Sequence, residues 1–350
     1  MNAQTVKPTT AGAGFAHHGG RLGAAQRAYP AAPQPWIDLS TGINPIAYPT
    51  PRATPEELNR LPDTQDVCRL EGLAAAVFGV PDPARVVCTP GSESALRLLP
   101  HLLGLDGVIV SGPTYGSHND AWVRAGCAAR VVPDSQVEAE IAARTALVIV
   151  NPNNPDGRVS ARERLLKLYE ATATRGGVLI VDEAFGEVVP GASVADVAGG
   201  QGRERLVVLR SFGKFYGLAG VRLGFAVAAP GLAARVRGVL GDWPVSADAL
   251  VAGLAAYCDP EWAASARLRL ERDARRLDDL LVGSGFAVLG GTSLFRLARA
   301  ADALRRFEAL AQAGILTRPF GHDATLLRFG IPGAEPEWLR VSAALRSSRA

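Results

Sequence analysis

The sequence has 350 residues, of which 48% are hydrophobic and 20% are charged. This composition is typical of a packed globular protein, and the length allows one large domain with a smaller one. The formal net charge is only +3 and no basic run is interleaved with aromatic residues, which argues against nucleic-acid binding.

Cysteine spacing and apolar run lengths exclude further classes. The four cysteines, Cys68, Cys88, Cys127 and Cys258, form no C-x-x-C pair, so we expect no metal site and no disulfide framework. No apolar run reaches the roughly 18 residues of a membrane span, and the start of the chain lacks the apolar core of a signal peptide. We therefore expect a cytoplasmic protein that binds no membrane.

The first part of the chain, residues 1–35, is rich in Ala, Gly, Pro and Thr and is predicted to be an irregular arm. From Val86 onward, short apolar runs recur that are typical of strands buried on both faces. The predicted strands are Val86–Cys88, Val108–Val110, Arg130–Val132, Leu147–Val150, Val178–Val181, Leu206–Leu209 and Gly224–Val227. Helical patterns at Ser92–Leu103 and Ala161–Ala173 lie between them. This alternation predicts an α/β fold with a mostly parallel seven-stranded sheet and helices on both sides.

The pattern changes after about Pro244. A long helix is predicted over Glu261–Leu281, and a shorter helix is predicted over Ala301–Ala313. Short strands are predicted at Phe286–Leu289, Ser293–Leu297 and Leu326–Phe329. We therefore expect an N-terminal arm over residues 1–45, a large domain over 46–243 and a small C-terminal α+β domain over 244–350.

Polar segments follow several predicted strands, where open α/β sheets bind their ligands. Thr89-Pro90-Gly91-Ser92-Glu93 joins a strand to a helix, so its free backbone N–H groups and the helix dipole can bind an anion. Gly91 would let the anion approach closely, and Ser92 adds a hydroxyl donor. An ordinary helix cap is the alternative interpretation.

An acid and an amine follow two other predicted strands. A carboxylate at Asp182 needs a partner near the sheet core, such as a protonated pyridine nitrogen, although a simple turn residue is the alternative. Lys214 lies in Ser211-Phe212-Gly213-Lys214, and the chain has only two other lysines, Lys7 and Lys167. Beside Arg222, its pKa could fall enough for reaction with a carbonyl, although a solvated lysine is the alternative.

The order of these signals is more informative than any one of them. Along the chain come a phosphate cradle, an aromatic ring at Tyr115, an Asn-Pro loop at Asn151–Gly157, then Asp182 and Lys214. Together they would bind the phosphate, ring face, phenolic oxygen, ring nitrogen and aldehyde of pyridoxal 5′-phosphate (PLP). This set predicts a PLP enzyme.

From about His17 to Arg340, the chain resembles fold-type I PLP enzymes of the aspartate-aminotransferase superfamily. His18-Gly19-Gly20, Asp38-Leu39-Ser40-Thr41-Gly42-Ile43-Asn44-Pro45 and Val181-Asp182-Glu183-Ala184-Phe185 resemble the threonine-phosphate decarboxylases of cobalamin biosynthesis. Histidinol-phosphate aminotransferases are also similar. The resemblance implies the type I PLP-dependent transferase fold and a homodimer with active sites near the interface.

The resemblance also implies residue roles. Lys214 would form the Schiff base, Asp182 would pair with the pyridinium nitrogen, Tyr115 would stack on the ring, and Asn154 would donate to its phenolic oxygen. Lys214, Asp182 and Tyr115 are thus the expected catalytic residues. The expected phosphate contacts are Gly91, Ser92, Glu93, Ser211 and Arg222. Arg328 would bind the substrate carboxylate, and the further substrate candidates are His18, Gly19, Gly42, Asn154 and Arg318.

Two positions depart from the aminotransferase pattern. Phe185 stands where transaminases usually have a tyrosine that donates to the phenolic oxygen, and phenylalanine there resembles the decarboxylases. Leu61, in Leu61-Pro62-Asp63, replaces a tyrosine that reaches the neighbouring subunit's cofactor phosphate. That cross-subunit contact is therefore in doubt for this chain.

The resemblance implies decarboxylation of L-threonine O-3-phosphate to (R)-1-amino-2-propanol O-2-phosphate, a small phosphorylated amino acid being the substrate. An aminotransferase acting on histidinol phosphate is the alternative. Decarboxylation requires the substrate carboxylate to lie out of the ring plane, whereas transamination places the proton there, within reach of Lys214. Both reactions use the same residues, so a pocket for the substrate phosphate, such as one with His18 and Arg318, could decide between them.

Other classes fit poorly. Ser211-x-x-Lys214 also occurs in serine acyl-transferases, but Ser117-His118-Asn119 precedes it rather than following it, and no Lys-Thr-Gly exists. No G-x-G-x-x-G or Walker loop supports nucleotide binding. A non-catalytic binding module with this fold would be expected to lack Lys214, which is present.

Overall fold

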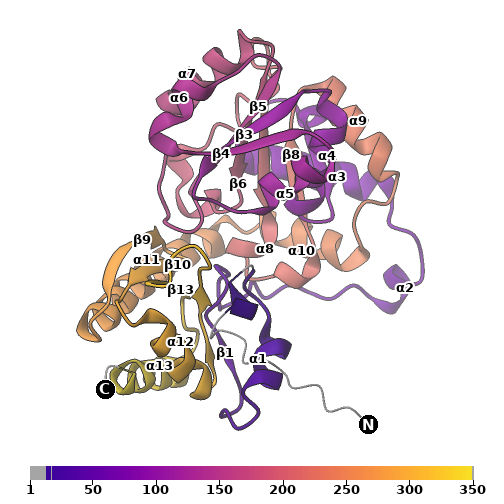
Figure 1. Cartoon of the computed structure of the whole chain (residues 1–350). Helices are drawn as coiled ribbons and strands as arrows, with labels where there is room; N and C mark the ends of the chain where they lie inside the picture. Colours follow the sequence, from indigo (N-terminus) through magenta and orange to yellow (C-terminus); the bar gives the residue numbers. More distant parts are fainter. Residues whose placement is uncertain (1–12, 17, 349–350) are drawn as a thin grey trace, which may run out of the picture. The chain divides into compact units, whose positions relative to one another are not determined.

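The computed structural model describes residues 13–16 and 18–348. The chain divides into two compact units, which we call the large unit (Ile46–Arg267) and the small unit (Met1–Pro45 with Leu268–Ala350). Figure 1 shows the elements of each unit in sequence colours. Residues 1–12 and 17 of the predicted arm lie outside the described residues.

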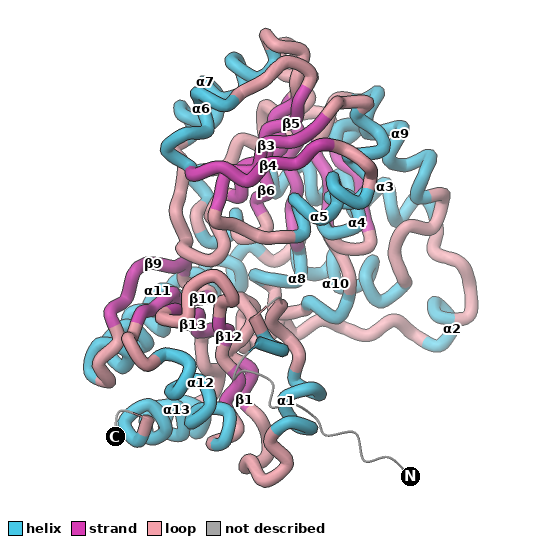
Figure 2. The backbone as a smooth tube through the Cα atoms, in the orientation of Figure 1, coloured by secondary structure: helices cyan, strands magenta, loops and turns pink. Residues whose placement is uncertain are grey.

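The large unit is built on one seven-stranded sheet in the order β2-β8-β7-β6-β5-β3-β4 (magenta in Figure 2). Its strands are β2 (Val86–Thr89), β3 (Gly107–Gly112), β4 (Ala128–Pro133), β5 (Thr145–Val150), β6 (Val178–Glu183), β7 (Leu206–Ser211) and β8 (Gly224–Val227). β8 is antiparallel to both of its neighbours, and the other pairs are parallel. The predicted mostly parallel sheet of seven strands is confirmed.

Helices cover both faces of this sheet. The helices of the large unit are α2 (Pro55–Leu58), α3 (Thr64–Phe78), α4 (Ser92–Leu103), α5 (Ser117–Arg124), α6 (Val137–Glu140), α7 (Arg162–Ala173), α8 (Phe212–Phe215), α9 (Pro230–Leu240), α10 (Ala247–Tyr257) and the start of α11 (Pro260–Gly283). Successive strand residues point to opposite faces. Val108 and Val110 of β3 therefore pack with the buried faces of α4 and α5. On the sheet's other side, Phe225 of β8 contacts Phe78 of α3 and Tyr257 of α10.

The two edges of the sheet differ. At β2, Glu71 accepts a hydrogen bond from the backbone N–H of Cys88 (2.8 Å), and Arg237 donates to the carbonyl of Val86. Glu71 and Arg237 are also an ion pair (2.8 Å), so side chains cover this edge. At the other edge the predicted strand exists as β4, but Val131 is 53% exposed. The expectation that this strand is buried on both faces was wrong, because the face that carries Val131 is open to solvent.

The small unit contains a four-stranded antiparallel sheet in the order β12-β13-β10-β9 and a short parallel pair, β1 with β11. Its elements are α1 (Leu22–Ala28), β1 (Ile37–Asp38), the rest of α11, β9 (Ala287–Thr292), β10 (Phe295–Arg299), α12 (Ala303–Gln312), β11 (Ile315–Leu316), β12 (Arg318–Pro319), β13 (Leu326–Gly330) and α13 (Glu335–Ser347). The predicted smaller α+β arrangement is confirmed.

The arm is more ordered than the sequence indicated. Residues 22–28 form helix α1, so the expectation of an irregular segment over 1–35 was wrong there. Leu-Gly-Ala-Ala-Gln-Arg-Ala is rich in good helix formers, and Ala25 is fully buried in the core of the small unit together with Phe307 and Leu310. Tertiary packing thus stabilises a helix that is too short to be stable alone.

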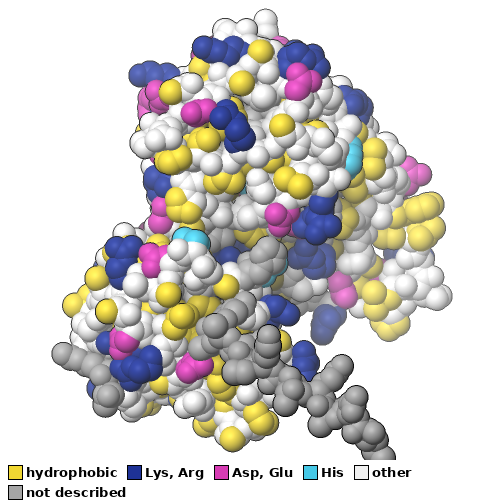
Figure 3. All heavy atoms as spheres, viewed as in Figure 1, with side chains coloured by type: hydrophobic (Ala, Val, Ile, Leu, Met, Phe, Trp, Pro, Cys, Tyr) yellow, Lys and Arg dark blue, Asp and Glu magenta, His cyan; other side chains and the backbone are white. Residues whose placement is uncertain are grey.

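The helices of the described residues are too short or too polar to cross a membrane. On the face seen in Figure 3, basic and acidic side chains are interspersed.

Candidate active site

The predicted site residues of the large unit lie where its parallel strands end, along the side of the sheet that we call the sheet edge from here on. Strands β2, β3, β5, β6 and β7 run in the same direction, so their carboxyl ends meet there. The predicted residues at these ends are Gly91–Glu93 after β2, Tyr115 after β3, Asn154 after β5, Asp182 in β6, and Ser211 and Lys214 at and after the end of β7. Arg222 lies two residues before β8, which starts at the same edge.

The start of α4 has the geometry of an anion site. Gly91 is its N-cap, with φ of 77° and no side-chain cap. A Cβ at Gly91 would lie 2.7 Å from Nη2 of Arg222, so the guanidinium lies directly against the positive end of the helix. Arg222 itself has φ of 61°, an uncommon conformation for a residue with a side chain. Two positive groups held together in this way provide a cradle for a phosphate.

The hydroxyl of Tyr115 is held by an acidic side chain from the same helix start. It donates to Oε2 of Glu93 (3.2 Å), and Glu93 is paired with Arg97 (2.6 Å). Burial raises the pKa of Tyr115, with added effects from the charges of Glu93 and Asp182, while a hydrogen bond with Ser117 opposes the rise. Tyr115 therefore remains a neutral phenol near pH 7.

Asp182 is buried and held in place through both carboxylate oxygens. Its side chain lies 2.8 Å from Nε2 of His118 through Oδ2, and Oδ1 accepts the backbone N–H of Ala184 (3.0 Å). Asp182 is 4% exposed and His118 is 2% exposed. Because a buried carboxyl group is costly without hydrogen bonds, the bonds with His118 and Ala184 stabilise Asp182 and fix its orientation.

His118 was not predicted as a site residue, because in the sequence it stood out only as the middle residue of Ser117-His118-Asn119. A helical period would have pointed to it, since His118, Ala121 and Trp122 share the buried face of α5. A histidine on a buried helix face, three residues after a predicted ring-stacking tyrosine, needs a polar partner. The partner, Asp182, lies on a strand 64 residues later, so the pair cannot be read from local sequence.

Lys214 lies in α8, immediately after β7, and its neighbours hold this short helix in place. Phe212 and Phe215 are at most 1% exposed, whereas Lys214 is partly exposed. Gly213 permits close packing, since a Cβ there would lie 2.5 Å from the Cα of Ala219. The backbone of Lys214 is therefore fixed, while its side chain reaches out of the aromatic core.

The loop that carries Asn154 begins with a buried asparagine. Asn151 donates to the carbonyls of Ser160 (3.2 Å) and Ala192 (3.3 Å), and its own oxygen accepts the N–H of Ser160 (2.8 Å). The backbone N–H of Asn151 donates to the carbonyl of Asp182 (2.8 Å). These bonds anchor the loop next to Asp182, and Asn154 is only 8% exposed.

In the small unit, two predicted substrate residues lie side by side. Arg318 of β12 is directly opposite Arg328 of β13 in the ladder. Arg328 is 3% exposed, donates to the carbonyl of Ser40 (2.8 Å) and lies over the ring of Phe295. Burial and the charge of Arg318 lower the pKa of Arg328, while Asp38 acts in the opposite direction. A buried guanidinium group with a partly buried one beside it favours a ligand with more than one negative charge.

The glycine segment of the arm lies at the same place in the small unit. A Cβ at Gly19 would lie 2.2 Å from the carbonyl oxygen of Ser40, the group that Arg328 binds. The backbone N–H of Gly20 donates to Oγ of Ser40 (2.8 Å). The structure thus brings Gly19 and Arg328 together around Ser40. His18 directly precedes Gly19, and Gly42 follows Ser40 by two residues.

The two departures from the aminotransferase pattern are in different surroundings. Phe185 is 4% exposed and follows the residue whose N–H binds Asp182. Leu61 is 62% exposed.

Comparisons with known proteins agree with this geometry. The chain is 38% identical to a threonine-phosphate decarboxylase of Pseudomonas aeruginosa over 94% of its length and 96% of the relative. It is 41% identical to a threonine-phosphate decarboxylase of Sinorhizobium sp over 90% of its length and 92% of the relative. The crystal structure of a histidinol-phosphate aminotransferase from Sinorhizobium meliloti in complex with pyridoxal-5′-phosphate has the same fold (TM-score 0.79, 20% identity, 94% of both chains). Residues 34–349 match the family described as aminotransferase class I and II. The resemblance seen in the sequence is confirmed, and the chain belongs to the aminotransferase class I and II family.

Proposed function

We propose that the chain decarboxylates L-threonine O-3-phosphate with PLP as its cofactor, forming (R)-1-amino-2-propanol O-2-phosphate for cobalamin biosynthesis. The observation that carries this proposal is the identity of 38% and 41% to two threonine-phosphate decarboxylases over most of both chains. The sheet edge supports it with an anion cradle, a buried acid and an amine at neighbouring strand ends.

The residues of the large unit fit PLP. The cradle of Gly91 and Arg222, where a Cβ would displace the guanidinium, suits the cofactor phosphate, and Ser92, Glu93 and Ser211 complete the proposed contacts. Asp182 would hold the proton of the ring nitrogen, Asn154 would donate to the phenolic oxygen, and Tyr115 would stack on the ring. PLP, when bound, supplies a ring that accepts the electron pair left by the departing carboxylate.

Two residues of this chain would handle protons. Asp182 would face the ring nitrogen and hold its proton, and the hydrogen bond with His118 fixes the orientation of this carboxyl group. Nζ of Lys214 would bind the cofactor aldehyde and later deliver the proton that replaces the carboxylate at the substrate Cα. The rigid backbone around Lys214 supports this role because proton transfer requires a fixed approach.

The small unit would bind the anionic groups of the substrate. We assign Arg328 to the carboxylate or the phosphate, with Arg318, His18, Gly19 and Gly42 as further contacts, and Asn154 remains a candidate for substrate binding. The like charges of Arg318 and Arg328 support this assignment, since a phosphorylated amino acid carries both a carboxylate and a phosphate. Such a ligand also relieves the repulsion between the two guanidinium groups.

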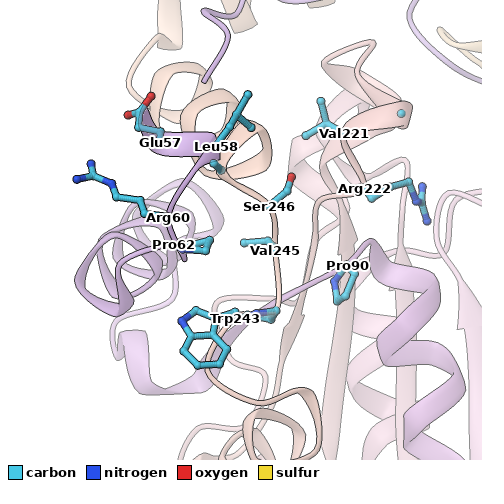
Figure 4. Close-up of a pocket in the computed structure, with 13 residues that line it drawn as sticks. Glu57, Leu58, Arg60, Pro62, Pro90, Val221, Arg222, Trp243, Val245 and Ser246 are labelled. Atoms are coloured by element: carbon cyan, nitrogen blue, oxygen red, sulfur yellow. The ribbon is translucent and has the colours of Figure 1, made fainter. Parts of the chain in front are cut away.

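We also propose that the protein is a homodimer. A pocket of about 550 Å³ has Arg222 and Pro90 on one side and Leu58 on the other, with Trp243 beside it (Figure 4). Leu58, Leu61 and Trp243 are 60%, 62% and 52% exposed. Large apolar side chains gathered near a binding site favour a covering partner, and a second copy of the chain is the simplest one. Sedimentation of a Leu58→Asp, Trp243→Asp variant should then show monomers.

All four cysteines are free thiols. Free thiols are typical of a reducing compartment, and we propose the cytoplasm as the site of action.

The reaction itself separates the two candidate functions. The purified protein with PLP is given L-threonine O-3-phosphate, and separately histidinol phosphate with 2-oxoglutarate, while carbon dioxide and glutamate are measured. We expect carbon dioxide and the aminopropanol phosphate in equal amounts from the first mixture. Glutamate from the second mixture, without carbon dioxide from the first, would identify an aminotransferase instead.

A further inference from the structure

The side chain of Asn153 connects two loops at the sheet edge. It is 1% exposed, and its oxygen accepts a hydrogen bond from Oγ1 of Thr114 (2.6 Å). Its Nδ2 donates to the carbonyl of Pro113 (3.0 Å) and to Oδ1 of Asp156 (2.7 Å). Both amide hydrogens and the amide oxygen are therefore used, two of the three bonds reaching the neighbouring loop.

Each loop presents a residue that we assign to the cofactor. Thr114 directly precedes Tyr115, and Asn153 directly precedes Asn154. The bonds of Asn153 thus join the chain positions next to the proposed ring-stacking residue and next to the proposed donor to the phenolic oxygen. A shift of one loop against the other would move both groups relative to a bound ring.

The sheet does not hold the two loops together by itself. The ladder between β3 and β5 runs from Gly107↔Thr145 to Val110↔Val148 and stops there. β3 then continues against β4, and β5 continues against β6. Within the described residues, the hydrogen bonds of the Asn153 side chain connect the loop after β5 to the loop after β3 beyond the point where this ladder ends.

The loop of Asn153 is rigid enough to transmit this restraint. The backbone N–H of Asn153 donates to the carbonyl of Arg158, and the N–H of Gly157 donates to the carbonyl of Asn153, both at 2.8 Å. Asp156 in turn accepts from the backbone N–H of Arg158 (3.0 Å). The turn is closed on itself, so a displacement at Asn153 is passed to Asn154 rather than absorbed.

Asparagine is the residue type that this position requires. Aspartate would place a second oxygen against two acceptors, the carbonyl of Pro113 and the carboxylate of Asp156. Alanine would leave the carbonyl of Pro113 and the hydroxyl of Thr114 without these bonds. A longer glutamine amide would not fit a fully buried site without displacing one of the loops.

We propose that Asn153 is a positioning residue that sets Tyr115 and Asn154 as one unit for the cofactor ring. The proposal rests on the proposed function for the roles of Tyr115 and Asn154. It predicts that the amide of Asn153 affects the bound cofactor through Thr114, a residue in another loop, and it does not require Asn153 to touch the cofactor.

The test is a double-mutant cycle read out on the cofactor rather than on turnover. Wild type, Asn153→Ala, Thr114→Val and the double variant are stripped of PLP and titrated with it. The dissociation constant is measured together with the visible circular dichroism of bound PLP and the pH at which its absorbance band titrates. Asn153→Ala should bind PLP about tenfold more weakly and Thr114→Val about threefold, since each lost hydrogen bond carries a modest free energy.

The cycle distinguishes coupling from general loop damage. The double variant should bind PLP no more than about twofold more weakly than Asn153→Ala, because the two residues share one bond. In both single variants the circular dichroism and the titration pH of the bound cofactor should change, while the unfolding temperature of cofactor-free Thr114→Val stays near that of the wild type. Arg158→Ala is the matched control, since it removes an ion pair with Asp156 but leaves the bonds to Pro113 and Thr114. It should leave both cofactor signals as in the wild type.

Unchanged cofactor signals in Asn153→Ala and Thr114→Val would overturn the proposal, as would fully additive losses in the double variant. If Asn153→Ala does not fold, Thr114→Val alone decides the matter, because it only replaces the hydroxyl that bonds to Asn153 with a methyl group of similar size. A wild-type protein that bound no PLP would overturn this inference together with the proposed cofactor. Absence of carbon dioxide release with the expected PLP signals would instead overturn the decarboxylase assignment and leave the role of Asn153 supported.

Discussion

Two groups of charged side chains, one in each unit, are arranged in opposite ways. At the sheet edge of the large unit, Arg210 is paired with Glu183 (2.8 Å) and Glu187 (2.9 Å), and Asp182 is hydrogen-bonded to His118 (2.8 Å). In the small unit, the neighbouring guanidinium groups Arg318 and Arg328 repel one another, and this repulsion adds to burial in lowering the pKa of Arg328.

This difference favours separate roles for the two units, one in holding the cofactor and the other in binding the substrate. Internal pairs keep the large unit's acid in a fixed orientation before any ligand arrives, which is what a permanently bound cofactor requires. Like charges in the small unit gain most when an anion binds, which is what a substrate that comes and goes requires. We therefore expect changes in the large unit to act on turnover and cofactor signals, and changes in the small unit to act on substrate saturation.

The largest effect is expected at Lys214. Lys214→Ala should lower turnover by roughly three orders of magnitude or more, because it removes both the covalent attachment and the proton donor. Steady-state carbon dioxide release is the measurement. Lys167→Ala, on the exposed face of α7, is the control and should behave as the wild type. Turnover retained in Lys214→Ala would show that Lys214 of the large unit does not carry out the reaction.

A smaller effect on a different constant is expected at Arg328. Arg328→Ala should raise KM about a hundredfold with a much smaller change in kcat, since a charge-assisted bond to a carboxylate or phosphate contributes a few kcal/mol. Arg299→Ala, an exposed arginine of β10 paired with Asp323, is the matched control. Unchanged substrate saturation in Arg328→Ala would mean that the arginine pair serves the fold and not the substrate.

The pair of Asp182 and His118 tests the other side of the comparison. His118→Ala should lower kcat about tenfold with KM nearly unchanged, because it removes one hydrogen bond to a buried charged group. The absorbance of bound PLP should also titrate at a different pH, which a purely structural role would not produce. Asn at position 118 should restore part of the signal, since its amide can still donate. If His118→Ala alters KM alone, the assignment of turnover to the large unit and of substrate saturation to the small unit is wrong.

The smallest effect is expected at Phe185, where reaction choice rather than rate is tested. Phe185→Tyr adds a hydroxyl in a buried position next to the loop of Asp182, and transaminases usually carry that hydroxyl. We expect a measurable rise in keto product relative to carbon dioxide, with total turnover within about tenfold of the wild type. An unchanged product ratio would leave substrate orientation by the small unit as the sole determinant.

Much of the fold could be predicted because its signals are local. Runs such as Val178–Val181 are apolar on both faces, and Ser92–Leu103 lies between two glycines, Gly91 and Gly104, so strand and helix type were clear. Helix α1 and the pairing of β1 with β11 could not be predicted in this way. Each depends on contacts with residues far along the chain, such as Ile37 with Ile315.

The candidate site divides along the same line. Lys214, Asp182 and Gly91 stand out in sequence because strand ends in parallel sheets are predictable locations. His118 and Asn153 do not, because their partners lie on other strands and loops, and only the three-dimensional arrangement reveals that they hold the predicted residues in place. Residues that we propose to bind ligand are thus easier to find from sequence here than residues that we propose to position them.

The scarcity of lysine permits one direct test of the central claim. The protein is incubated with PLP, reduced with borohydride, digested and mapped by mass spectrometry. With only Lys7, Lys167 and Lys214 in the chain, a covalent pyridoxyl group has three possible side-chain positions. We expect one equivalent per chain, on Lys214. A label on Lys167 or Lys7, or no label at all, would contradict the account.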